Sequence, residues 1–147
     1  MTSAIDSNEP TAGSPVKQVI VLRKDLKMRR GKEIAQGSHA SAAFITKRLE
    51  EVPDRELLHA GVLQEARFSP VELQWMAGEF RKIVCYVESE GELEALYESA
   101  KAADLTVHMV TDLGATEFHG VPTKTCIAIG PNYSHEIDPL TRHLKLY

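Results

Sequence analysis

Three polar side chains fall on one face of a helix predicted near the start of the chain. Lys32, Gln36 and His39 are spaced at i, i+4 and i+7, so a helical backbone places them along a single stripe. Lysine supplies a cation for a phosphate or a developing oxyanion, glutamine donates and accepts hydrogen bonds, and histidine carries a proton or donates. Alternatively, His39 is a partly buried histidine with its partners satisfied, and Lys32 is an ordinary surface lysine that the helix dipole disfavours in a first turn.

A second group of candidate residues, 111–116 (TDLGAT), directly follows a segment that reads as a strand. In open α/β sheets, ligands bind just outside the carboxyl ends of the strands. Asp112 at such a position orients or deprotonates water, Gly114 permits a tight turn, and Thr116 offers a hydroxyl. The alternative is an Asx-type turn, in which Asp112 only caps its own backbone. The spacing alone leaves both interpretations open.

Basic residues are concentrated in one short segment, although the formal net charge of the whole chain is −4. Residues 23–32 hold six basic side chains against one aspartate, so this segment carries +5 and the remainder carries −9. The six are Arg23, Lys24, Lys27, Arg29, Arg30 and Lys32. A compact basic patch on an acidic body suits a polyanion bound at one defined place, and the alternative is a solvated charge run.

Several kinds of site are disfavoured by the sequence. It contains no GxSxG elbow, no P-loop and no GxGxxG motif, and its six histidines show no HxH or HxxxH spacing. We therefore expect neither a metal ion nor a cofactor. Cys85 and Cys126 each lie inside an apolar run, which predicts buried reduced thiols in strands, with a disulfide or a catalytic thiol as alternatives.

Strands and helices alternate along the chain, which predicts an α/β fold with helices on both faces of a sheet. Strands are expected at 18–22, 81–87, 106–111 and 124–129, the last closed by Gly130-Pro131, and helices at 31–49 and 89–103. Ser69, Pro70 and Glu72 have the pattern of a helix start, and this short helix should end near Gly78. Residues 1–16 read as a flexible tail, and residues 50–68 as a helical or irregular excursion.

Length and composition indicate one ordinary globular domain over residues 17–147. The chain has 147 residues, of which 43% are hydrophobic and 26% charged, enough to bury a core without disulfide or metal staples. No signal peptide opens the chain, and no apolar run approaches the roughly 18 residues of a membrane span. We expect a soluble, cytoplasmic protein that makes no use of a membrane.

The order of several short motifs resembles the type-2 peptidyl-tRNA hydrolase family. Residues 17–40 (KQVIVLRKDLKMRRGKEIAQGSHA) are similar to the opening of that family, with a strand, DLKM, a basic loop, GK, and AQxSHA on a helix. Residues 81–87, 111–116 (TDLGAT), 123–131 (TKTCIAIGP) and 137–147 (IDPLTRHLKLY) follow it in the same order. Each motif alone is modest, but their combination is specific and covers most of residues 17–147.

The resemblance implies a three-layer α/β/α domain with a mixed sheet of about four strands, usually assembled as a homodimer. It implies hydrolysis of the ester that joins a peptide to the 3′ end of tRNA. Our hypothesis for the mechanism is a direct attack of water on the ester carbonyl. The positions that match the family's active site are Lys32, Gln36, His39, Asp112, Thr116 and Thr125. Phosphates of the peptidyl-tRNA are expected to contact Lys27, Arg29, Arg30 and Lys32.

The sequence departs from the family pattern close to these positions. Ala115 stands where the family usually has arginine, Glu117 where it has glutamine, and Arg142 where it often has glycine; residues 118–123 are one residue longer than usual. Ala115 removes a cationic contact, and Glu117 adds a negative charge. These departures leave two alternatives, a non-catalytic RNA-binding or scaffold protein of the same fold, and an esterase for another acylated RNA.

Overall fold

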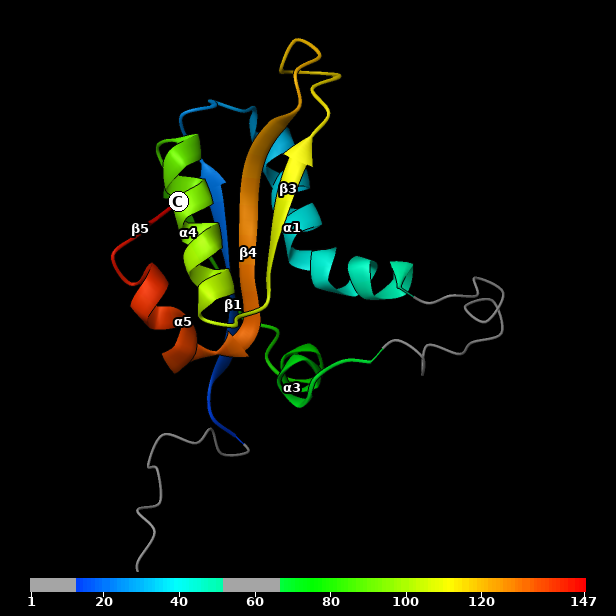
Figure 1. The fold of residues 1–147 in the computed structure, drawn as a ribbon, viewed down its shortest axis with the longest axis vertical. Helices are drawn as coiled ribbons and strands as arrows, with labels where there is room; N and C mark the ends of the chain where they lie inside the picture. Colours follow the sequence, from blue (N-terminus) through cyan, green and yellow to red (C-terminus); the bar gives the residue numbers. More distant parts are fainter. Residues whose placement is uncertain (1–12, 52–66) are drawn as a thin grey trace, which may run out of the picture.

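The computed structural model describes residues 13–51 and 67–147. Within these ranges, four helices flank one five-stranded mixed sheet (Figure 1). In sheet order, the strands are β3 (Val107–Asp112), β4 (Thr123–Tyr133), β1 (Val16–Arg23), β2 (Lys82–Val87) and β5 (Lys145–Leu146). β1 and β2 run parallel, and the other neighbouring strands are antiparallel. The α/β fold class predicted from the sequence is therefore confirmed, with one strand more than expected.

The helices form a layer on each side of the sheet (Figure 1). They are α1 (Arg30–Glu50), α3 (Pro70–Ala77), α4 (Glu90–Ala102) and α5 (Ser134–Thr141). α4 and α5 cover one face, while α1 covers the other. α3 is fastened to α1 by an edge-to-face contact between Trp75 and Phe44, whose ring centroids lie 5.8 Å apart. This arrangement produces the three layers that the resemblance implied.

β1 is buried on both faces, which explains its unbroken apolar sequence. Val19 and Val21 point to the core under α4 and α5, while Ile20 and Leu22 point to the core under α1. β4 alternates in the same way, because successive side chains of a strand point to opposite faces. β1 and β4 thus contribute side chains to the cores on both faces of the sheet.

The predicted end of the fourth strand was wrong. β4 passes through Gly130-Pro131 and continues to Tyr133. Its last residues still pair with the start of β1, where the register shifts between Lys17 and Val19, and the left-handed backbone of Gly130 (φ +97°) fits this irregularity. A β-bulge therefore carries the strand past a residue that cannot donate to the ladder.

Other predicted elements agree with the structure. Ser69 accepts a hydrogen bond from the backbone of Glu72, whose carboxylate accepts in return from the backbone of Ser69, so the capping box starts α3 as expected. The predicted tail over 1–16 and the excursion over 50–68 lie largely outside the described residues. In the described part of the chain, no helix is both long and apolar enough to cross a membrane.

Both cysteines are free and buried, as the sequence predicted. Cys85 lies on β2 and Cys126 on β4. Burial raises the pKa of the Cys85 thiol, and it raises the pKa of Cys126 to about 12. Neither thiol is therefore suited to act as a nucleophile at neutral pH.

Candidate active site

Two parts of the chain that are distant in sequence meet at one end of the sheet. The loop after β1, the first turns of α1 and the loop between β3 and β4 all lie at this end, beyond the last residues of β3 (Figure 1). The carboxyl end of a strand, at which ligands commonly bind, is here bordered by the start of a helix. The candidate residues on α1 and those at 111–116 are therefore brought together, although about eighty positions separate them in the chain.

Lys32 is the centre of the contacts between α1 and β3. Its Nζ lies 2.6 Å from Oδ2 of Asp112 and 3.1 Å from Oγ1 of Thr116. The two charged side chains are only 16% and 14% exposed, so their attraction is screened less than that of a surface pair. The ammonium offsets the carboxylate, and the carboxylate in turn offsets the unfavourable place of a lysine in the first turn of a helix.

The two oxygens of Asp112 have different partners. Oδ1 accepts a hydrogen bond of 2.7 Å from the backbone N–H of Gly114, while Oδ2 accepts from Lys32 and, at 3.2 Å, from Nε2 of Gln36. The side-chain bond from Lys32 and then the backbone bond from Gly114 hold the pKa of Asp112 below its usual range. The Asx turn and the interaction cluster are thus both present, and Asp112 is an anion at neutral pH.

Gln36 is held in place by a hydrogen bond from Thr125 on β4. Oγ1 of Thr125 lies 2.5 Å from Oε1 of Gln36, and both residues are buried. Thr125 occupies a β-bulge, since Val110 pairs with Cys126 while Thr111 pairs with Lys124. Bulges often re-aim a side chain beside an active site. Here Thr125 orients the amide of Gln36, which leaves its nitrogen pointing at Asp112.

A small hollow of about 280 Å³ opens above this cluster. Its walls include Lys32, Gln36, Asp112, Thr116 and His39. His39 is exposed, and no protein hydrogen bond to its imidazole is present among the described residues. The alternative of a partly buried, satisfied His39 is therefore wrong. Five of the six active-site positions implied by the resemblance line the hollow, and Thr125 lies beneath it.

The loop that carries Thr116 is closed by a tight backbone contact. The N–H of Gly120 donates to the carbonyl of Gly114 at 2.9 Å, and a Cβ on Gly114 would lie 2.4 Å from the carbonyl oxygen of Val121. Gly114 also has a left-handed backbone, with φ of +81°. Glycine is therefore required here for two reasons, and its N–H is the one that fixes Asp112.

The basic segment divides into structural and exposed residues. Arg23 is buried and bonds both carboxylate oxygens of Asp25, so it is not part of an outer patch. Four cations, Lys24, Lys27, Arg29 and Arg30, are exposed in the loop after β1 and at the start of α1. Because Lys32 pairs with Asp112 inside the hollow, the exposed part of the basic patch carries these four cations.

The two departures closest to the site have different surroundings. Ala115 lines the hollow with a methyl group and adds no charge. Glu117 faces the basic segment, where its Oε1 is 3.7 Å from Nε of Arg29. Neither residue takes part in the hydrogen bonds around Asp112, so the cluster is complete without the arginine and glutamine that the family usually has.

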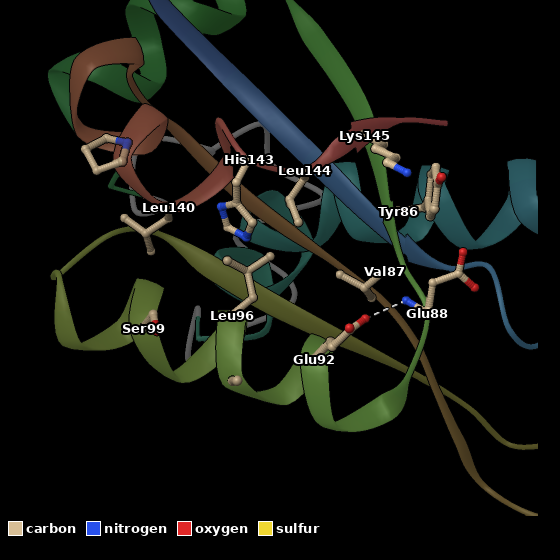
Figure 2. A pocket seen from close by; sticks show the side chains of 12 residues that line it. Tyr86, Val87, Glu88, Glu92, Leu96, Ser99, Leu140, His143, Leu144 and Lys145 are labelled. Carbon is tan, nitrogen blue, oxygen red and sulfur yellow. Dashed lines mark hydrogen bonds between the residues drawn. The ribbon is translucent and has the colours of Figure 1, made fainter.

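A larger hollow, of about 590 Å³, lies elsewhere, between α4 and the segment from α5 to β5. Figure 2 shows Leu96, Leu140 and Leu144 in its wall, with His143 and Glu92 among the polar groups. The carboxylate of Glu92 accepts from the backbone N–H of Glu88, and this is the interaction drawn in Figure 2. Within the part of the chain that the structure describes, this larger hollow has no hydrogen-bond network that joins several of its polar side chains. The size of a hollow alone therefore does not identify the active site.

The features of the site differ in how clearly the sequence signals them. The Asx turn at Asp112, which the sequence offered as an interpretation, is present as the bond from the backbone N–H of Gly114. The contact between Arg29 and Glu117 depends on how two loops approach each other, and no spacing in the sequence encodes it. Within the described residues, no group of three or more His, Cys, Asp or Glu side chains is placed to hold a metal ion.

Comparison with known proteins gives a consistent result. The profile of the family described as "Peptidyl-tRNA hydrolase PTH2" matches residues 16–147. The chain is 34% identical over 131 residues to the peptidyl-tRNA hydrolase of Methanocaldococcus jannaschii, covering 89% of this chain and 99% of that protein. It is 38% identical over 130 residues to that of Methanopyrus kandleri, covering 88% and 97%. It is 33% identical over 130 residues to "Probable peptidyl-tRNA hydrolase 2" of Drosophila melanogaster, covering 88% and 61%.

Proposed function

Because this chain belongs to the peptidyl-tRNA hydrolase PTH2 family, it is an enzyme that hydrolyses peptidyl-tRNA, and we propose that the cluster around Asp112 performs the reaction. One observation carries this assignment. Two donors from α1, Lys32 and Gln36, converge on a single carboxylate oxygen at the end of β3, inside a hollow that opens to solvent. Such a convergence prepares a fixed electrostatic environment for a reacting group.

Asp112 orients the attacking water in this proposal. Its lowered pKa keeps it ionised at neutral pH, so it accepts a hydrogen bond from water but has little tendency to take a proton fully. Water attacks the carbonyl carbon, the bond from that carbon to the ribose oxygen breaks, and the proton lost by water ends on the leaving oxygen. Positioning and electrostatics therefore contribute more than base strength.

Lys32 stabilises the negative charge that develops on the ester oxygen. An ammonium has three N–H donors, and Asp112 and Thr116 account for two of them among the described residues. The third is available for the oxyanion. Gln36 and Thr125 keep the carboxylate aligned, and His39 lines the hollow where it can bond a substrate group.

In this proposal, the RNA lies over the basic loop. Lys27, Arg29 and Arg30 are exposed next to the start of α1, which carries Lys32. Phosphates bound there would bring the ester-bearing 3′ end to the hollow, and they would compete with Glu117 for Arg29. The acidic remainder of the chain disfavours RNA on other faces.

A homodimer is part of the same proposal. An apolar groove of about 500 Å³ runs between α1 and β2, and Ile34, Phe80 and Val84 on its walls are exposed. A surface of this kind suits a protein interface. Light scattering should give twice the mass of one chain, and Ile34→Glu should reduce it to one. The cytoplasmic location expected from the sequence stays a prediction.

The activity is tested with purified protein and two substrates. N-acetylaminoacyl-tRNA and free aminoacyl-tRNA are incubated with the protein, and release of the ester is followed. Hydrolysis of the N-blocked substrate supports the proposed reaction. Binding of tRNA without hydrolysis of either substrate would favour a non-catalytic RNA-binding protein, and hydrolysis of another acylated RNA alone would favour a different esterase.

A further inference from the structure

Two exposed apolar residues, Leu113 and Val121, lie on the loop between β3 and β4 and are called the apolar lip here. Leu113 lines the catalytic hollow, and Val121 lies with its backbone against Gly114, the neighbour of Leu113. Leu113 is 79% exposed, the highest value among the described large hydrophobic residues, and Val121 is 59% exposed. Single exposed apolar residues are common on proteins, but two on one short loop beside an active site call for an explanation.

The backbone of this loop brings the two residues of the lip together. Leu113 is followed by Gly114, whose Cα faces the backbone of Val121 so closely that a Cβ would lie 2.7 Å from its nitrogen. The N–H of Gly120 closes the same contact on the carbonyl of Gly114. The loop is thus folded back on itself, and both side chains are exposed to solvent.

Stability of the loop does not require the lip. Phe118 is the apolar residue that anchors the loop, since it packs against the core under α1 and its ring lies 5.8 Å from Nζ of Lys32. The carbonyl of Phe118 also accepts from the N–H of Val121. The loop therefore has its own inward anchor, while Leu113 and Val121 remain exposed to water.

The surroundings of the hollow differ in chemistry. The exposed cations Arg29 and Arg30 come directly before the turn of α1 that carries Lys32, whereas the exposed apolar residues Leu113 and Val121 belong to the loop between β3 and β4. The substrate is equally asymmetric, because the ester joins a polyanion to a peptide. We propose that Leu113 and Val121 bind the side chain of the peptide residue next to the ester, while the RNA lies over the cations.

This inference rests on the proposed function and gives it a substrate preference. Apolar contact at an open lip is tolerant of sequence, and it strengthens with the apolar area of the bound side chain. The enzyme should therefore bind peptidyl-tRNA ending in a large apolar residue more tightly than one ending in glycine. A nucleobase of the tRNA is the other possible occupant of the lip, and it would give no such preference.

The test uses one tRNA that carries either N-acetylphenylalanine or N-acetylglycine through a 3′-amide in place of the ester, so that binding is measured without turnover. The unmodified protein should bind the phenylalanyl form about fivefold more tightly, and Leu113→Ser should abolish most of this ratio while Leu113→Met keeps it. Leu73→Ser is the matched control, because Leu73 is a half-exposed leucine on α3 at the other end of the sheet.

The outcomes separate the proposal from the function it rests on. An unmodified protein with equal affinity for both forms, or a ratio that survives Leu113→Ser, overturns the lip. If Leu113→Ser weakens both forms equally, the lip binds RNA or shapes the loop, and the proposal also fails. Failure of the proposed function would give a different result: the matching esters would not be hydrolysed, although the binding ratio would persist.

Discussion

Two lysine–aspartate pairs stand at opposite ends of the molecule, and only one of them belongs to a site. Lys32 and Asp112 join the start of α1 to the end of β3, while Lys17 and Asp138 join the start of β1 to α5. Both pairs are largely shielded, with side-chain exposures of 16% and 14% for the first and 9% and 31% for the second. The charges and the residue types are identical.

The difference lies in what surrounds each pair. Asp112 accepts two further hydrogen bonds, from Gln36 and from Gly114, and it opens into a hollow. Among the described residues, the side chains of Lys17 and Asp138 bond only each other. An ion pair alone is thus a poor indicator of chemistry, whereas converging donors beside an opening are a strong one.

The largest effect is expected from breaking the first pair. Lys32→Ala should lower hydrolysis of peptidyl-tRNA by at least about 100-fold, equivalent to about 2.7 kcal/mol of transition-state stabilisation. The fold should remain intact, because Gln36 and Gly114 still bond Asp112. Initial rates on N-acetylaminoacyl-tRNA and a thermal unfolding curve measure the two quantities. Unchanged turnover would remove Lys32 from the site.

Lys17→Ala is the matched control for that variant. It leaves Asp138 without its cation in a partly buried place, so the free energy of unfolding should fall by about 1–2 kcal/mol. Hydrolysis per folded molecule should stay the same. Urea unfolding measures the stability, and the rate of hydrolysis per folded molecule measures the activity. If Lys17→Ala lost turnover at unchanged stability, the Lys17–Asp138 pair would also belong to the site, which would contradict the account.

The charges near the first pair are tested next. Replacing Arg29 and Arg30 with glutamate should weaken tRNA binding about tenfold or more and flatten its salt dependence, since each lost phosphate contact lowers the slope by about 0.7–0.9. Lys101 and Arg142 are exposed cations near α4 and α5, and their replacement with glutamate makes the same change of charge. If both double variants change the salt slope equally, the RNA is not placed by the basic loop.

A smaller effect is expected beneath the cluster. Thr125→Val keeps the shape of the side chain but removes the hydroxyl that holds Gln36. The buried amide oxygen then loses its partner, which should cost about 1–3 kcal/mol of stability and lower kcat several-fold with little change in KM. Steady-state kinetics distinguishes the two constants. A change confined to KM would mean that Thr125 contributes to binding rather than alignment.

The smallest effect concerns acid. Because the native pKa of Asp112 is lowered, its contribution to stability is fully present above the unfolded pKa of about 3.9 and is lost as the pH falls through the native value. The difference in unfolding free energy between the unmodified protein and Asp112→Asn should therefore shrink with falling pH. A difference that grows with acid would mean that Asp112 is protonated in the native state.

Local sequence predicted much of the fold but not how its parts meet. The strand at 18–22 and the capping box of α3 were both predicted from residue types. The two-residue strand β5 was not, because only its pairing with β2 makes it a strand. The continuation of β4 past Gly130-Pro131 depends on the bulge opposite β1 and was likewise hidden.

The site shows the same division. Helical spacing correctly grouped Lys32, Gln36 and His39, but it could not show that His39 stands exposed while Gln36 is buried. The place of Thr125 follows from a bulge in the β3–β4 ladder, which a strand pattern does not reveal. Spacing within an element is fixed by local geometry, whereas contacts between elements are set by tertiary packing.

The measurement that tests the account most directly is made on Asp112→Asn. This change keeps the size of the side chain but deletes its charge, and it leaves one oxygen instead of two to accept hydrogen bonds from Lys32, Gln36 and Gly114. Turnover of N-acetylaminoacyl-tRNA should fall by at least about tenfold, while the affinity for uncharged tRNA stays equal or rises, because one negative charge near the RNA is gone. Collapse of tRNA binding with unchanged turnover per bound tRNA would contradict the account and reduce Asp112 to a residue of the turn.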